Sequence, residues 1–136
     1  MANYKIEDIE GIGEVTGKKF RDAGVKDTDA LLAASTTPSA RARLAEATGL
    51  SAAQVLKFAN MADLYRIHGV GSDYAQLLEA AGVDTVPALA RRAPANLAAT
   101  LAQVNAEKKL TRRVPPEADV AKWNEQAKEL PRVLED

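Results

Sequence analysis

The sequence predicts an all-α protein built from two related helical units. Three observations support this prediction: apolar residues recur at helical spacing, no segment alternates apolar and polar residues as a half-buried strand does, and a glycine-rich pattern occurs twice. With 136 residues, 46% of them hydrophobic, the chain is long enough to bury one compact core.

The two copies are separated by 58 residues over most of their length. Ile9 to Gly13 matches Ile67 to Gly71, and Ala23 to Val25 matches Ala81 to Val83. An insertion around Pro115 and Pro116 then shifts the register. Because a repeat of roughly sixty residues usually indicates paired supersecondary units, we expect one unit over residues 1–64 and a second over residues 65–136.

Helix signals follow one another through the first unit. Thr37-Pro38 is typical of an N-cap with proline at the first helical position. Ser51 to Gln54 has the pattern of a capping box. The helix that starts there is expected to bury Val55, Phe58, Ala59 and Ala62 on one face. Three glycines are each expected to end a helix: Gly24, Gly49 and, in the second unit, Gly82.

The second unit continues in the same way. Thr85 can cap a short helix, and Pro94 separates that helix from a longer one over about residues 95–110. Pro115-Pro116 breaks the chain before a last helix. Its apolar residues at helical spacing are Val120, Trp123, Ala127 and Leu130. We therefore expect about eight or nine helices, each of five turns or fewer.

Each glycine pair stands in a longer pattern, with a small residue four positions on, an apolar residue three further, and Ala-Gly at the helix end. The small residues are Gly17 and Ala75, and the apolar ones are Phe20 and Leu78. This pattern resembles the helix-hairpin-helix motif of SAM-like helical proteins. The resemblance implies two hairpins whose backbone N–H groups bind the phosphate backbone of DNA or RNA without reading sequence.

Within each hairpin the glycines are expected to form a tight turn. We predict that Gly13 and Gly71 adopt backbone conformations that a bulky residue resists, and that Ile12 and Val70 pack down between two helices. Phe58 and Trp123 should occupy equivalent core positions of the two units.

Nearly the whole chain also resembles a bacterial family of uncharacterised proteins that carry two such hairpins. The segments concerned are Ile9 to Gly13, Ala62 to Leu64, Arg66-Ile67 and Gly82 to Val86. This resemblance implies the two-hairpin fold and a soluble bacterial protein, but it implies no activity.

The two hairpins differ in charge. DNA-binding hairpins usually place Lys or Arg two residues after the second glycine, where this chain has Val15 and Asp73. Asp73 would repel a phosphate, whereas Lys18 and Lys19 follow the first hairpin. We therefore expect the first hairpin to bind phosphate and the second to be structural.

Further basic residues stand near the end of the long helix. Lys108-Lys109 and Arg112-Arg113 recur at one-turn spacing, with Arg91-Arg92 at the end of the helix before. They can form a basic stripe, or they can simply complement helix C-termini. The candidate nucleic-acid-binding residues are therefore Gly11, Ile12, Gly13, Thr16, Lys18, Lys19, Gly69, Val70, Gly71, Lys108, Lys109, Arg112 and Arg113.

Composition argues against several other classes of protein. The chain has no cysteine and a single histidine, so we expect no metal site, no cofactor and a cytoplasmic location. We expect neither a membrane span nor an export signal. The glycines from Gly11 to Gly17 loosely resemble a dinucleotide fingerprint, but no βαβ unit surrounds them. We therefore expect neither an enzyme nor a small-molecule substrate.

Two functions stay open at this point. Weak, sequence-independent binding of nucleic-acid backbone ranks narrowly first, because a duplicated hairpin is the usual way to grip both strands. A protein-interaction or scaffolding module is the alternative, because the net charge of −1 gives no strongly basic footprint. Whether the two hairpins face one surface does not follow from the sequence.

Overall fold

The computed structural model describes residues 3–136, and every regular element in that range is helical. The elements are η1 (Ile6–Asp8, a 3-10 helix), α1 (Glu14–Asp22), α2 (Thr28–Ala34), α3 (Pro38–Thr48), α4 (Ala52–Leu64), α5 (Ser72–Ala80), α6 (Val86–Ala90), α7 (Pro94–Lys108) and α8 (Glu117–Glu129). An isolated β-bridge joins Lys5 and Asp27, and no strand occurs in the described range. The prediction of an all-α fold is confirmed.

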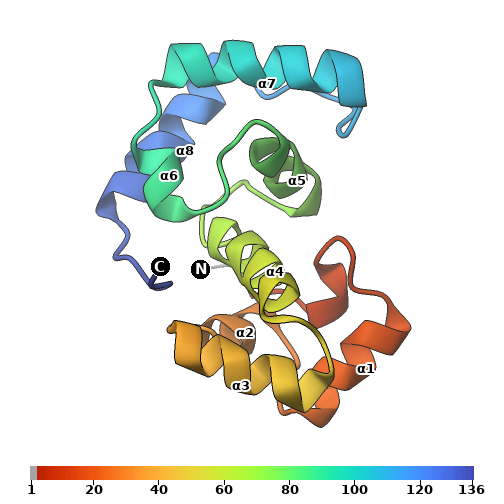
Figure 1. Cartoon of the computed structure of the whole chain (residues 1–136). Helices are drawn as coiled ribbons and strands as arrows, with labels where there is room; N and C mark the ends of the chain where they lie inside the picture. Colours follow the sequence, from red (N-terminus) through yellow and green to blue (C-terminus); the bar gives the residue numbers. More distant parts are fainter. Residues whose placement is uncertain (1–2) are drawn as a thin grey trace.

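The helices gather in two groups that meet around α4. Helices α1 to α4 pack on one another, α5 to α8 do the same, and α4 contacts α5 in the middle of the molecule (Figure 1). Most of the apolar face predicted for each group's last helix is buried, including Val55 and Phe58 on α4 and Val120 and Trp123 on α8. None of the helices described here is long and apolar enough to cross a membrane.

The predicted helix starts are confirmed. The Thr37 hydroxyl accepts the backbone N–H of the third residue of α3 at 3.0 Å, and the Thr85 hydroxyl does the same for α6 at 3.3 Å. At the start of α4, Ser51 and Gln54 form a complete capping box, with bonds of 3.1 and 2.9 Å. These bonds satisfy N–H groups that have no partner within their own helix, so local sequence is sufficient to place the helix starts.

The helix ends agree with the prediction, with one shift. Gly24, Gly49 and Gly82 have φ values of +87°, +75° and +91°, the left-handed region that favours glycine. Helix α7, expected to run to about residue 110, ends at Lys108, because Lys109 turns into the left-handed region with φ +50°. Arg112 therefore lies in a loop and not on the helix end.

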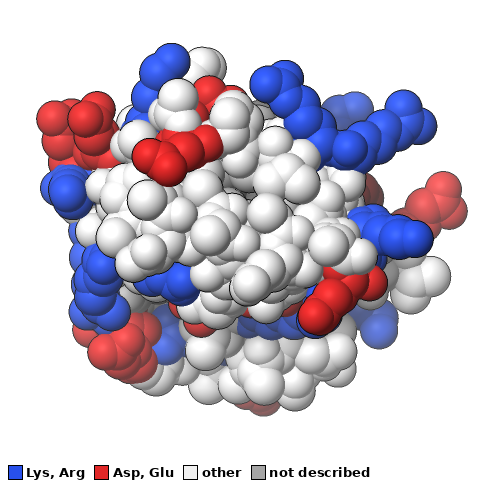
Figure 2. Space-filling view, turned by 90° about the horizontal axis from the view of Figure 1, so that it is seen from above, with Lys and Arg blue, Asp and Glu red and all other residues white. Residues whose placement is uncertain are grey.

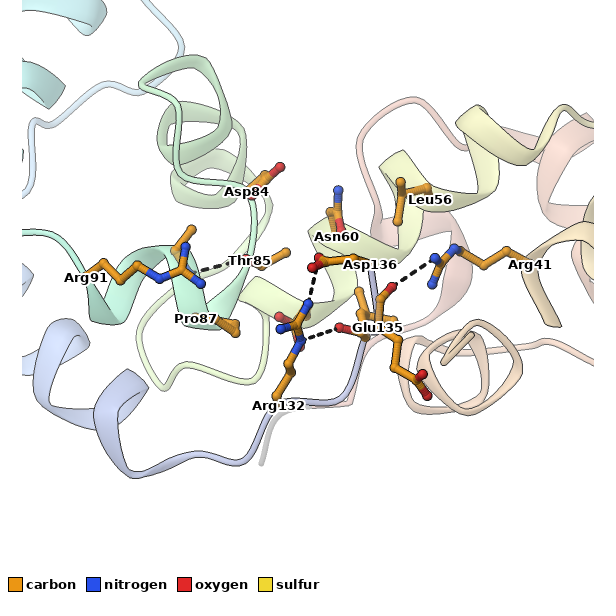
Figure 3. A pocket seen from close by; sticks show the side chains of 13 residues that line it. Arg41, Leu56, Asn60, Asp84, Thr85, Pro87, Arg91, Arg132, Glu135 and Asp136 are labelled. Carbon is orange, nitrogen blue, oxygen red and sulfur yellow. Dashed lines mark hydrogen bonds and ion pairs between the residues drawn. The ribbon is translucent and has the colours of Figure 1, made fainter. Parts of the chain in front are cut away.

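The chain's last residues run back toward the first group of helices. The Glu135 N–H donates to the Thr36 carbonyl at 2.8 Å, and the Arg41 guanidinium donates to the Glu135 carbonyl at 2.9 Å (Figure 3). Leu134 is buried beside them. The segment after α8 thus ties the two helical groups together.

Candidate nucleic-acid interface

The two glycine pairs form turns that are alike in backbone conformation, here called the first glycine turn (residues 9–13) and the second glycine turn (residues 67–71). Gly11 has φ +93° and Gly69 has φ +96°. Gly13 and Gly71 have φ −95° and −101° with ψ near 180°, which is extended backbone that any residue adopts. The prediction that Gly13 and Gly71 are the constrained positions is wrong: the constraint falls on the first glycine of each pair.

Close packing adds to this constraint. A Cβ atom on Gly11 would lie 3.2 Å from the Phe58 ring, and one on Gly69 would lie 3.1 Å from Nε1 of Trp123. A Cβ atom placed on Gly13 or on Gly71 would have no atom within 4 Å, apart from those of its neighbours in the sequence. The second glycine of each pair instead serves as the N-cap of the following helix.

The side chains between the glycines point into the core, as predicted. Ile12 and Val70 are both buried. Phe58 and Trp123 are 7% and 4% exposed, so the prediction that both are core residues is confirmed. The ring of Phe58 also lies edge-on to Phe20, with centroids 6.1 Å apart.

The two glycine turns are close neighbours, with Tyr65 between them. The Tyr65 hydroxyl donates to the Asp8 carbonyl at 3.4 Å, just before the first turn, and Ser72 interacts with the same hydroxyl just after the second. Burial raises the pKa of Tyr65; Ser72 lowers it, and the carboxylates of Asp8 and Glu10 raise it further. The carboxylates of Asp8 and Glu10 thus place negative charge near Tyr65, which disfavours a phosphate beside the first turn.

The lysines beside the first turn are only partly available. Lys18 forms an ion pair with Asp22, with Nζ 2.8 Å from the carboxylate oxygen, and this pair raises the pKa of Lys18. Lys19 is exposed, and Thr16 is half-buried.

The surface around the first turn is otherwise acidic or apolar. Glu10 and Glu14 are both exposed beside Gly11 and Gly13. Val15 is 73% exposed at the position where a DNA-binding hairpin usually has a cation. The expectation that the first hairpin is the phosphate-binding one finds little support in these surroundings.

A groove of about 570 Å³ lies beside the second glycine turn. It is lined by residues from this turn, from the start of α5 and from the loop after α7: Gly69, Gly71, Ser72, Asp73, Tyr74, Thr111, Arg112 and Arg113. The packing of α5 on α7 brings these segments together. The second glycine turn, which was expected to have only a structural role, thus has two arginines next to it.

A buried asparagine fixes the loop that carries these arginines. The Asn105 side chain accepts from the Thr111 N–H at 2.9 Å and donates to the Thr111 carbonyl at 3.0 Å. The Thr111 hydroxyl in turn donates to the Arg113 carbonyl at 2.8 Å. Arg112 and Arg113 themselves are exposed. In Figure 2, Lys and Arg side chains project on the right-hand side, where the C-terminal end of α7 lies, with acidic side chains among them.

The predicted basic residues do not all line this groove. Of the four around the end of α7, only Arg112 and Arg113 line the groove, and Lys108 and Lys109 lie outside its lining. Arg91 faces a different cavity, and Arg92 donates to the Ala81 carbonyl at 3.5 Å. Ser72, Tyr74 and Thr111 also line the groove and Asn105 supports it, although no local sequence pattern assigned them to a site.

Arginines also surround a cavity of about 250 Å³ between the two helical groups. There Arg132 pairs with Asp136 at 2.6 Å, and Arg41 donates to the Ser35 and Glu135 carbonyls (Figure 3). The guanidinium groups of Arg41 and Arg132 are thus already bonded within the chain, and several carboxylates also line the cavity, so it is a weaker anion site than the groove beside the second turn.

The chain is thus a small helical protein with a surface groove that is lined by two arginines and by a glycine turn. A family model described as Domain of unknown function (DUF4332) matches residues 10–130, so the chain belongs to that family. No curated protein and no solved structure matches it.

Proposed function

We propose that this protein is a non-enzymatic, tandem helix-hairpin-helix module that binds nucleic-acid backbone weakly and without sequence preference. The observation that carries the proposal is the position of Arg112 and Arg113 in the same groove as Gly69 and Gly71. We therefore assign the phosphate contact to the second hairpin, although the sequence alone suggests the first.

The chemistry of the groove suits a phosphate. The N-terminus of α5 directs unpaired backbone N–H groups and the positive end of a helix dipole outward from Gly71. Two guanidinium groups stand against one carboxylate, Asp73, so the local charge favours an anion. The bonds from Asn105 to Thr111 hold the arginine loop, the segment after α7 that carries Arg112 and Arg113, in place before any ligand binds. This lowers the entropic cost of binding.

Few phosphate contacts give weak binding. We expect dissociation constants of about 10⁻⁴–10⁻⁶ M at physiological salt, the range typical of nonspecific binding. Fluorescence anisotropy with a labelled nucleic acid at several salt concentrations measures both the affinity and the number of phosphates contacted, because each contact contributes about −0.9 to the log–log slope on a duplex.

The decisive variant is the double change Arg112→Glu and Arg113→Glu. It should abolish binding, or reduce the log–log salt slope by the contribution of about two phosphate contacts. The matched control, Lys18→Glu with Lys19→Glu, reverses the same number of charges beside the first turn and should weaken binding far less. Equal effects of the two double variants would contradict the assignment to the second hairpin, and no binding by the unaltered protein at low salt would overturn nucleic-acid binding itself.

A protein-interaction module is the second candidate. The observation that favours it is the exposed Val15 beside the first glycine turn, in acidic surroundings that phosphate avoids. An apolar side chain at this place cannot neutralise a phosphate as a cation there would. If the unaltered protein fails to bind nucleic acid at low salt, this face is the one to test, by comparing partner binding of Val15→Glu with that of the unaltered chain.

A further inference from the structure

The groove beside the second glycine turn contains an aromatic side chain as well as cations. Tyr74 lines it from α5 and is half-buried. Its ring lies 5.2 Å from that of Trp123, tilted by 53°. Because Trp123 is buried on α8, Tyr74 is held against a fixed support. The groove therefore has a rigid aromatic wall next to its arginine loop.

Two side chains of the groove, Asp73 and Tyr74, have no suitable partner in a duplex. The outer surface that a duplex presents to a backbone-binding protein consists of sugar and phosphate, while the faces of its bases are stacked inside. The carboxylate of Asp73 would repel such a phosphate, and the ring of Tyr74 would find no base to stack on. A binding site for duplex backbone alone therefore gives neither side chain a role in binding.

An unpaired nucleotide supplies a partner for each of them. Its phosphate suits Arg112 and Arg113, and its base can stack on the ring of Tyr74, as bases do on aromatic side chains in single-strand-binding proteins. The N–H groups on the base edge can donate to the carboxylate of Asp73. The groove's volume of about 570 Å³ lies within the range of 300–1,000 Å³ typical of small-ligand clefts.

We propose that this groove binds an unpaired nucleotide of a nucleic-acid strand, so that the protein prefers single-stranded to double-stranded nucleic acid. This inference rests on the proposed function, because both use Arg112 and Arg113. It adds a base-binding role for Tyr74 and Asp73.

The test compares dissociation constants for a short labelled single strand and for the duplex of the same sequence at one salt concentration. The unaltered protein should bind the single strand more tightly. Tyr74→Leu should weaken single-strand binding by roughly 5- to 150-fold, the effect of losing one stacked base, and leave duplex binding nearly unchanged. Tyr74→Phe, which keeps the ring, should retain the preference.

Asp73→Asn separates base contact from general charge. Removing the carboxylate should strengthen duplex binding more than single-strand binding, so the ratio of the two dissociation constants should move toward one. The double variant Lys18→Glu and Lys19→Glu should leave this ratio unchanged. A ratio that is unaffected by Asp73→Asn and by Tyr74→Leu would overturn the inference.

Trp123 provides a readout that needs no substitution. It is the single tryptophan of the chain and lies against both Tyr74 and Gly69. We expect an unlabelled single strand to quench its fluorescence, and the duplex to quench it much less. Equal affinity for both nucleic acids, with binding still lost in the Arg112→Glu and Arg113→Glu variant, would overturn this inference and leave the proposed function intact. Absence of binding to either would overturn both.

Discussion

Gly69 lies so close to Trp123 that a Cβ atom at residue 69 would come within 3.1 Å of the indole nitrogen. Gly69 also has φ +96°, a conformation that residues with a Cβ rarely adopt. These two constraints act on the same residue, and they set the path by which the chain enters α5.

The first prediction follows from this relationship. Gly69→Ser should lower the free energy of unfolding by about 1–3 kcal/mol, because the serine must adopt a strained conformation and displace the indole. Gly71→Ser is the matched control. It should be neutral or slightly stabilising, because Gly71 is an extended N-cap with open space around it and serine is a favoured N-cap residue. Urea unfolding of both variants measures the difference, and equal losses would contradict the assignment of strain to Gly69.

The second prediction concerns the two buried aromatic residues. Truncation of Phe58 or of Trp123 to alanine should each cost about 3–5 kcal/mol, because a large cavity is left where each ring meets its glycine turn. Thermal and urea melting measure the loss. In the unaltered protein the emission of Trp123 should be blue-shifted relative to free tryptophan, and a fully solvated indole would contradict its burial.

The third prediction is a dependence of stability on pH. The Arg21 guanidinium donates to both carboxylate oxygens of Glu7, at 2.8 and 2.5 Å, and these bonds lower the pKa of Glu7 from 4.5 to about 2. A carboxyl group with a lowered pKa contributes stability above its ordinary pKa, and the contribution is lost as the pH falls through the lowered value. The melting temperature of Glu7→Gln should therefore lie below that of the unaltered protein above about pH 4.5, and the two should converge toward pH 2.

Glu14→Gln serves as the control for this measurement. Glu14 is also exposed near the first glycine turn, and it forms no ion pair within residues 3–136. Its substitution should produce no comparable difference across this pH range. A Glu7→Gln difference that persists at pH 2 would show that the carboxylate acts by packing and not by charge.

The fourth prediction concerns a buried ion pair. Asp63 accepts from Arg66 at 2.7 Å and from the Val86 N–H at 2.8 Å, and both side chains are almost fully buried. Asp63→Asn should cost about 3–5 kcal/mol, because it leaves the Arg66 charge buried without a counter-charge. Adding Arg66→Met should recover part of the loss, so that the double variant is less destabilised than the sum of the two single variants. Strict additivity in urea unfolding would contradict this coupling.

Local sequence was sufficient to predict several of the helix starts and ends. The caps at Thr37, Ser51 and Thr85, and the helix ends at Gly24 and Gly82, depend on hydrogen bonds and backbone angles within a few residues. The buried positions of Phe58 and Trp123 followed from helical spacing for the same reason. Even at this level the sequence did not reveal which glycine of each pair is constrained, because that depends on the approach of an aromatic ring from a distant helix.

The candidate site was decided by tertiary structure. Arg112 and Gly69 are far apart in the sequence, and they meet only because α5 packs on α7 and because Asn105 holds the loop that follows α7. The sequence determined the glycine turns and the charges, since both are local properties. Which charges face which turn depends on the packing of whole helices, and this is why the basic groove lies at the second turn although the lysines nearest in sequence follow the first.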